Sequence, residues 1–336
     1  MNTVSNTETS KEKILTVRDL RVHFEIREEG AWPWQKPLAL KAVNGIDLDI
    51  YAGETLGVVG ESGCGKSTLA RALIGMLPAH TGSVVWMGQD LAKMNKKEMR
   101  SKRQDLQMIF QDPLASLNPR MTIGDIIAEP LTTFHPEYSK TQVKEKVQAI
   151  MTRVGLLPNM INRYPHEFSG GQCQRIGIAR ALILKPKLVI CDEPVSALDV
   201  SIQAQVINLL KELQEEMGLA LVFIAHDLSV VRHISDRVMV MYLGNAVEVA
   251  DAQELYTNPK HPYTKALMSA VPIPDPKIER NKKVQLLLGD LPSPINPPSG
   301  CVFRTRCPEV QAHCADKCPV LAPVNGNNHE VSCHLV

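Results

Sequence analysis

The fold of this 336-residue chain is decided by a glycine-rich segment, Gly60-Glu61-Ser62-Gly63-Cys64-Gly65-Lys66-Ser67-Thr68. It follows a short apolar segment typical of a buried strand, Thr55 to Val59, and precedes apolar residues at helical spacing. Such a turn predicts backbone N–H groups that surround phosphates, assisted by the positive end of the helix. Lys66 would then bridge two phosphates, and the Ser67 hydroxyl would bind Mg²⁺.

The segments around this loop predict an α/β fold. Leu188 to Cys191 and Leu219 to Ala225 are continuously apolar and are separated by an amphipathic helix, which indicates a parallel sheet covered on both sides. Ile14 to Ile26 and Leu40 to Tyr51 largely alternate apolar and polar residues, which favours a small antiparallel β layer. Asp112 to Leu184 has a mostly helical pattern with proline breaks and is interpreted as a helical insertion.

Two carboxylates follow the apolar segment Leu188 to Cys191, at the edge where α/β sheets bind ligands. Asp192 suits Mg²⁺, and Glu193 is placed to polarise a water that attacks a phosphate, which is the role of a general base.

A second helix start is found at Ser169-Gly170-Gly171-Gln172. Ser169 suits a helix N-cap, and the two glycines permit close backbone approach to a phosphate. Since one chain needs only one phosphate loop, this second helix start is expected to face a nucleotide held by another subunit. A dimer follows from that expectation.

These motifs together resemble the ATP-binding cassette family, in which Ser-Gly-Gly-Gln is the diagnostic signature. The resemblance implies ATP and Mg²⁺ as cofactors and a RecA-like core with an antiparallel β layer. It implies further roles for residues found in the family's order. Gln111 would sense Mg²⁺ and nucleotide, and His226 would contact the γ-phosphate. Asp199 would be the last residue of the D-loop, Ser196 to Asp199, and Phe24 would stack on adenine.

The C-terminal third narrows the resemblance to the ATPases of oligopeptide and dipeptide importers, and most to their F-type subunits. The similarity lies in Asn258 to Thr264, Leu291 to Pro294 and Cys301 to Pro308. It implies an ATPase that drives peptide uptake from the cytoplasmic side of the bacterial inner membrane. The implied partners are a similar D-type ATPase subunit, two membrane permease subunits and a periplasmic peptide-binding protein.

Composition agrees with a peripheral subunit. The 37 basic and 36 acidic residues leave a net charge of +1, so nothing global favours nucleic acid or an anionic membrane. No segment approaches the roughly 18 apolar residues of a membrane span. We expect a disordered tail over residues 1–13, a nucleotide-binding unit over 14–265 with its helical part at about 113–184, and a Pro- and Cys-rich unit over 266–336.

Five of the eight cysteines lie in the last 36 residues, which favours a metal over disulfides in a reducing compartment. Relatives in the peptide importer group carry a [4Fe-4S] cluster on comparable cysteines, which here would be Cys301, Cys307, Cys314 and Cys333. Zinc and free thiols stay as alternatives, and so does ligation by Cys318 in place of Cys314. A region that only braces a dimer is a further alternative.

A non-transport cassette protein that acts on DNA or the ribosome, with the cysteines as a redox sensor, is the rival interpretation. The single phosphate loop, the lack of sustained heptads and the lack of a basic stripe weigh against it.

Overall fold

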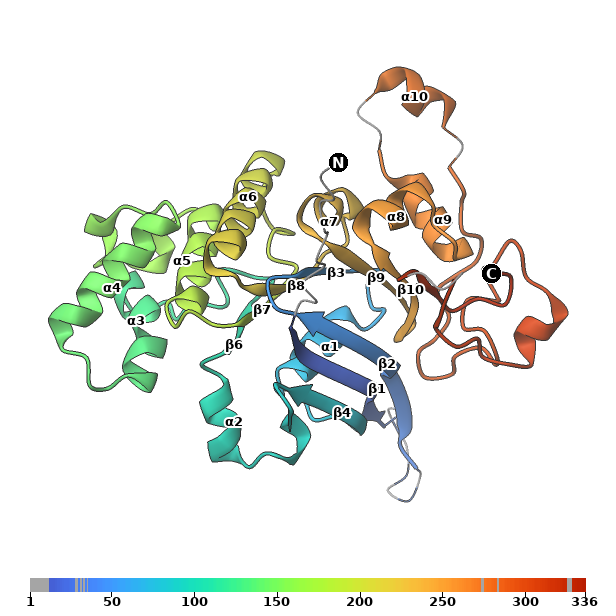
Figure 1. Cartoon of the computed structure of the whole chain (residues 1–336), viewed down its shortest axis with the longest axis horizontal. Coiled ribbons are helices and arrows are strands. Elements are labelled where there is room, and N and C mark those ends of the chain that lie inside the picture. Colours follow the sequence, from blue (N-terminus) through green and yellow to red (C-terminus); the bar gives the residue numbers. More distant parts are fainter. Residues whose placement is uncertain are drawn as a thin grey trace, which may run out of the picture.

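The computed structural model describes residues 12–27, 30, 32, 34, 36–272, 275–282, 284–324 and 328–336. Residues 1–11 of the predicted tail, which spans residues 1–13, lie outside the described residues, whereas Lys13 already belongs to the first strand. The described strands form a four-stranded and an eight-stranded sheet. Figure 1 shows helices on both sides of the larger sheet and the smaller sheet below it.

The larger sheet confirms the predicted α/β core. Its order is β11 (Ala322–Pro323), β12 (Glu330–Val331), β10 (Asn245–Asp251), β9 (Arg237–Tyr242), β3 (Thr55–Val59), β8 (Ala220–Ile224), β7 (Leu188–Asp192) and β6 (Leu106–Ile109). The strands from β9 to β6 in this order are parallel to their neighbours, whereas β10, β11 and β12 pair in antiparallel fashion. Because parallel strands present their carboxyl ends at one edge, the loops after β3, β6, β7 and β8 meet there.

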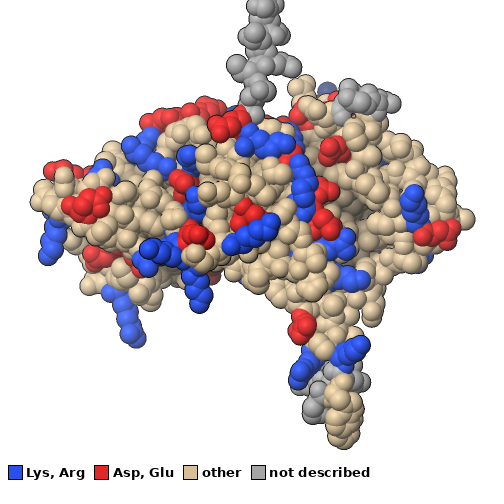
Figure 2. Space-filling view, turned by 60° about the horizontal axis from the view of Figure 1, so that its bottom comes forward, with Lys and Arg blue, Asp and Glu red and all other residues tan. Residues whose placement is uncertain are grey.

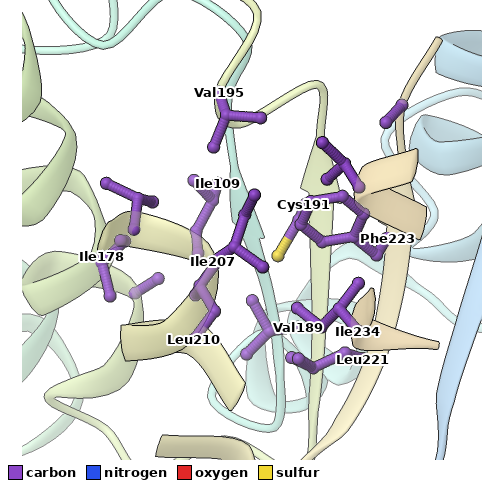
Figure 3. Close-up of a cluster of buried hydrophobic side chains, with 14 of the residues drawn as sticks. Ile109, Ile178, Val189, Cys191, Val195, Ile207, Leu210, Leu221, Phe223 and Ile234 are labelled. Atoms are coloured by element: carbon purple, nitrogen blue, oxygen red, sulfur yellow. The ribbon is translucent and has the colours of Figure 1, made fainter. Parts of the chain in front are cut away.

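Both faces of the parallel strands are buried. On β7, Val189 and Cys191 enter one hydrophobic cluster, while Leu188 and Ile190 enter a second cluster on the other face. Figure 3 shows the first cluster, in which Cys191 lies near Phe223 of β8. Among the helices that contribute to it are α5 (Gly170–Leu182), α6 (Val200–Met217) and α7 (Leu228–Ile234). The second cluster contains α1 (Lys66–Leu73) and the smaller sheet.

The smaller sheet is the predicted antiparallel layer. Its order is β2 (Leu38–Tyr51), β1 (Lys13–Ile26), β4 (Thr81–Trp86) and β5 (Gln89–Asp90). The pairing of β1 with β2 shifts register between Val22 and His23, so the alternation breaks there. Val22 is buried as expected, but Phe24 and Ile26 are exposed by more than a third.

The helical insertion is also present, although its first helix begins only at Ile123, eleven residues after Asp112. It consists of α3 (Ile123–Phe134), α4 (Lys140–Arg153), η2 (Pro158–Met160), η3 (Pro165–Glu167) and α5. Thr122 and Ser139 accept hydrogen bonds from the first turns of α3 and α4, which explains where those helices start. Between β5 and β6 lie η1 (Leu91–Lys93) and α2 (Lys96–Lys102).

The C-terminal region contains α8 (Ala252–Thr257), α9 (Pro262–Ala270), α10 (Pro276–Asn281) and η4 (Ala312–Ala315) before β11 and β12. It is less irregular than its prolines indicate, because β12 pairs with β10 and so extends the main sheet. The reason lies in Glu248 of β10, which is fully buried and accepts hydrogen bonds from the backbone of Lys260 and His261 and from His329.

No helix in the described part of the chain is both long and apolar enough to cross a membrane. On the face shown in Figure 2, basic and acidic side chains are interspersed.

Candidate nucleotide site

A pocket of about 320 Å³ opens at the carboxyl edge of the main sheet. Most of the glycine loop lines it, as do Gln111 after β6, Glu193 after β7 and the aromatic Phe24 of β1. Four segments far apart in the sequence therefore line one cavity. The loop contributes Ser62, Gly63, Gly65, Lys66, Ser67 and Thr68.

The loop takes its shape from glycines that no other residue replaces without strain. Gly65, at the N-cap of α1, has a φ of 103°, and a Cβ there would lie 2.0 Å from the carbonyl oxygen of Ala42. Gly60 has a φ of 155°, and its Cβ would lie 2.3 Å from the carbonyl oxygen of Met241. The loop thus packs directly against β2 and β9, and these contacts fix the direction in which its N–H groups point.

The two residues predicted to bind phosphate and Mg²⁺ already have partners. The Lys66 ammonium donates to the carbonyl oxygens of Gly60, at 2.8 Å, and Glu61, at 3.0 Å. The Ser67 hydroxyl donates to Asp192 Oδ1 at 2.8 Å. Burial raises the pKa of Asp192, and the hydrogen bond from Ser67 opposes that rise. A cation beside Ser67 and Asp192 would stabilise the buried carboxylate.

Glu193 is connected to both predicted sensors of the nucleotide. Its Oε2 accepts a hydrogen bond from Gln111 Nε2 at 3.1 Å and lies 3.6 Å from Nδ1 of His226. The Glu193 backbone has a φ of +47°, which is uncommon for a residue with a side chain. Its N–H donates to the carbonyl of Ile224 and its carbonyl accepts from Ser196, so β8 and the next turn hold this conformation. The carboxylate is thereby aimed into the pocket.

The remaining predicted residues lie elsewhere. Gly60, Glu61 and Cys64 do not line the pocket, and burial raises the pKa of the Cys64 thiol. The segment Ser169 to Gln172 starts α5, where Ser169 and Gln172 form a capping box. It lies outside the pocket, as does the exposed Asp199 at the start of α6. The chain does not bring its own signature segment to its own phosphate loop.

Several pocket residues escape the sequence motifs, namely Leu40, Lys41, Ala42, Leu243, Gly244 and Pro294. Gly244 carries a weak signal, because it lies in a tight turn between two strands, and its N–H donates to the carbonyl of Cys64. Pro294 carries none, since it reaches the pocket from the C-terminal region.

The cysteine prediction is not supported. Among the described residues, no group of three or more His, Cys, Asp or Glu side chains is arranged to hold a metal ion. The four named thiols are nevertheless neighbours. Burial raises the pKa of Cys301 to about 11, and the nearby Cys314, Cys333 and Cys307 add to the rise.

Comparison with known proteins agrees with this geometry. The family model "ABC transporter" matches residues 43–196, and the model "Oligopeptide/dipeptide transporter, C-terminal region" matches residues 247–314. The oligopeptide transport ATP-binding protein OppF of Salmonella typhimurium is 69% identical over 95% of this chain and 95% of that protein. The chain belongs to the OppF-like family of ABC transporter ATP-binding proteins.

Two further comparisons extend this result. OppF of Escherichia coli is 67% identical over 99% of this chain and 98% of its own length. A dimeric post-hydrolysis structure of the ATP-binding cassette MJ0796, bound to ADP and phosphate, has a TM-score of 0.64. It is 25% identical and covers 71% of this chain and 99% of that chain. The fold outside the C-terminal region is therefore that of an ABC ATPase.

Proposed function

We propose that this chain is the subunit of an ABC importer that binds and hydrolyses ATP to drive the uptake of oligopeptides. The observation that carries this proposal is the convergence of the phosphate loop, Gln111 and Glu193 on one pocket, in a chain whose C-terminal region matches peptide transporters. The reaction is hydrolysis of the bond between the β- and γ-phosphates by water.

Binding begins with the exchange of existing contacts. The Lys66 ammonium leaves the carbonyls of Gly60 and Glu61 for the β- and γ-phosphates, and the loop N–H groups from Gly63 onward bind phosphate oxygens. Phe24, 38% exposed at the rim, offers its ring to the adenine. For Lys66, the exchange replaces neutral carbonyl acceptors by charged phosphate oxygens.

Mg²⁺ fits the oxygen donors at the start of α1 and the end of β7. Ser67 would hold it through its hydroxyl and Asp192 through its carboxylate, with Gln111 close by. When bound, Mg²⁺ neutralises charge on the phosphates. The support for this assignment is geometric, because the Ser67 hydroxyl and the Asp192 carboxylate lie 2.8 Å apart.

Glu193 acts as the general base. Gln111 donates to its carboxylate and orients it, so that it accepts a proton from the attacking water while His226 binds the γ-phosphate. Since His226 is 62% exposed, it is free to move from Glu193 toward a bound nucleotide.

The site is completed by a second cassette. The Ser169 to Gln172 segment and Asp199 would contact the nucleotide of the partner subunit, and the partner's equivalent segment would cover the phosphates here. Support comes from the dimeric state of the solved relative and from their position outside this chain's pocket. We assign the partner as the D-type ATPase of the same importer.

The permease subunits would dock in a groove of about 860 Å³ beside the helical insertion. The groove lies between the end of α1, α2 and the end of α3, and its apolar lining includes Met76, Met99 and Phe134. Arg100, Arg103 and Glu129 also line it, so it suits a short amphipathic helix. The importer would hold this chain on the cytoplasmic side of the inner membrane, with a periplasmic binding protein that supplies peptide.

The resident cofactors of this proposal are ATP and Mg²⁺. A [4Fe-4S] cluster on Cys301, Cys307, Cys314 and Cys333 would require these thiols to move into a ligating arrangement, and no step here depends on it. Iron and sulfide analysis of anaerobically purified protein tests that idea. We keep residues 14–265 as the nucleotide-binding unit and 266–336 as an accessory unit.

The test of the function is uptake of a labelled tripeptide by cells that lack this chain, complemented with the wild type or with Glu193→Gln at matched expression. We expect uptake only with the wild type. Peptide uptake that is unchanged when the chain is deleted would refute the peptide substrate.

A further inference from the structure

The C-terminal region holds the phosphate loop at Glu61 by two separate contacts. The backbone N–H of Glu61 donates to the hydroxyl of Tyr263 on α9 at 3.0 Å. The Glu61 carboxylate accepts two hydrogen bonds from the Arg306 guanidinium, at 2.8 and 3.2 Å. Arg306 lies 245 positions further along the chain, in the turn between Cys301 and Cys307.

These contacts are rigidly supported. The Arg306 side chain is only 9% exposed, and Tyr263 is fully buried. The ring of Phe303, in the same turn as Arg306, lies 5.2 Å from that of Tyr242 and 5.4 Å from that of Tyr263. This aromatic cluster joins β9, α9 and the turn, so Arg306 has little freedom to leave Glu61.

A third contact lies at the other end of the pocket. The carbonyl of Pro294 accepts a hydrogen bond from the Lys41 N–H of β2 at 3.2 Å. Pro294 also lines the nucleotide pocket together with Phe24 and Leu40. The segment from Tyr263 to Arg306 therefore contacts both the loop and the rim of the nucleotide site.

The electrostatics give the Arg306 contact a consequence for nucleotide binding. Glu61 is part of the phosphate loop, so an unpaired carboxylate there would repel the negative charge of a triphosphate. Arg306 neutralises that carboxylate, and Tyr263 fixes the peptide that carries it. The Lys66 ammonium binds the carbonyl of the same Glu61, which links this clamp to the phosphate-binding lysine.

We propose that Arg306 is a positioning residue of the ATP site, which acts through Glu61 to hold the phosphate loop ready for nucleotide. The proposal rests on the proposed function in that the ligand is ATP. It gives the C-terminal region of this chain a role in nucleotide affinity that does not depend on a metal at its cysteines.

The test is the affinity for a fluorescent ATP analogue, measured with the full chain in the assembled importer. Arg306→Gln leaves Glu61 unpaired, so we expect about tenfold weaker binding, the size of one lost charge-assisted contact. The KM for ATP should rise by a similar factor, while kcat at saturating ATP should stay within about twofold, because the lost contact favours binding rather than the transition state.

Arg304→Gln is the matched control. Arg304 lies in the same turn but donates to Ser299, so this variant should bind the analogue as the wild type does. The double variant Glu61→Gln with Arg306→Gln removes the charge as well as its partner, and should regain most of the lost affinity. Should Arg306→Gln not fold, Arg306→Lys takes its place with a smaller loss in the same direction.

Affinity that is equal in Arg306→Gln and the wild type would overturn the proposal, as would an equal loss in Arg304→Gln or a double variant as weak as Arg306→Gln alone. None of these results would affect the proposed function, which instead fails if the wild type binds no nucleotide.

Discussion

The nucleotide edge of the main sheet and the C-terminal region both depend on hydrogen bonds of polar side chains, but these hydrogen bonds differ in whether a ligand can replace them. At the edge, the bonds are ones that a ligand can replace: Lys66 binds two backbone carbonyls, and His226 is mostly exposed. Where the C-terminal region attaches to the main sheet, Glu248 of β10 is fully buried and accepts three hydrogen bonds from groups of the protein itself. The comparison teaches that different side chains bind the ligand and attach the C-terminal region, and that the two sets meet at Glu61 and at the rim near Pro294.

The largest effect is expected when a side chain that binds the nucleotide is removed. Lys66→Ala removes the only lysine of the loop, and we expect affinity for ATP to fall on the order of a hundredfold. Binding of a fluorescent ATP analogue measures this. Lys97→Ala, on the exposed side of α2, is the control and should bind as the wild type does. Equal binding by Lys66→Ala would contradict the assigned phosphate contact.

The next largest effect is expected when the buried carboxylate that attaches the C-terminal region is removed. Glu248→Ala leaves two backbone N–H groups and His329 without their acceptor, so we expect the free energy of unfolding to fall by about 3–5 kcal/mol. Denaturant unfolding of the full chain measures it. Glu215→Ala, at an exposed position of α6, should change the value by less than about 0.5 kcal/mol. Similar stability of the two variants would mean that the Glu248 cluster is not a structural attachment.

A pH dependence sharpens the same comparison. Burial lowers the pKa of His261 from 6.5 to about 4, and its Nδ1 accepts from the N–H of Tyr263. As the pH falls, the unfolded chain therefore protonates this imidazole before the folded chain does. The contribution of the neutral imidazole to stability is fully present above pH 6.5 and is lost as the pH falls toward 4. We expect the wild type to lose about 3 kcal/mol more than His261→Asn across this window. Parallel pH curves for the two proteins would contradict the assignment.

A smaller effect of opposite sign is expected at Asp192. Because burial raises its pKa in the folded chain, the folded state binds more protons than the unfolded state, and stability falls as the pH rises through this range. Asp192→Asn removes the free-energy cost of keeping an ionised carboxylate buried. We expect the nucleotide-free protein to melt about 2 °C higher at pH 7, with Mg²⁺-dependent ATP hydrolysis strongly reduced. A lower melting temperature would contradict the account of a carboxylate that lacks its cation.

Sequence patterns predict the nucleotide edge well because its residues follow strands in order. The loop after β3, Gln111 after β6 and Glu193 after β7 each carry a local signal, and parallel strands bring such positions to one edge. The exposure of Phe24 is not predictable in this way, since the alternation of buried and exposed residues is interrupted by a register shift between β1 and β2.

The C-terminal region is predicted less well. Its prolines and cysteines indicate irregular chain and a metal, whereas its attachment depends on Glu248 with His329 and on Glu61 with Arg306. These pairs are separated by 81 and 245 positions, and neither has a periodic or motif-like signature. Only the packed structure brings them together.

The most direct test of the central claim is the ATP hydrolysis rate of the assembled importer with Glu193→Gln in this chain. The partner cassette has its own ATP site, which would mask the effect. The general base of the partner is therefore inactivated by substitution in every sample. We expect hydrolysis to fall at least about a hundredfold, with binding of the ATP analogue kept within about twofold. The control Glu212→Gln, at an exposed position of α6, should hydrolyse ATP at the wild-type rate. Hydrolysis retained within a few-fold in Glu193→Gln would contradict the assignment of Glu193 as the general base.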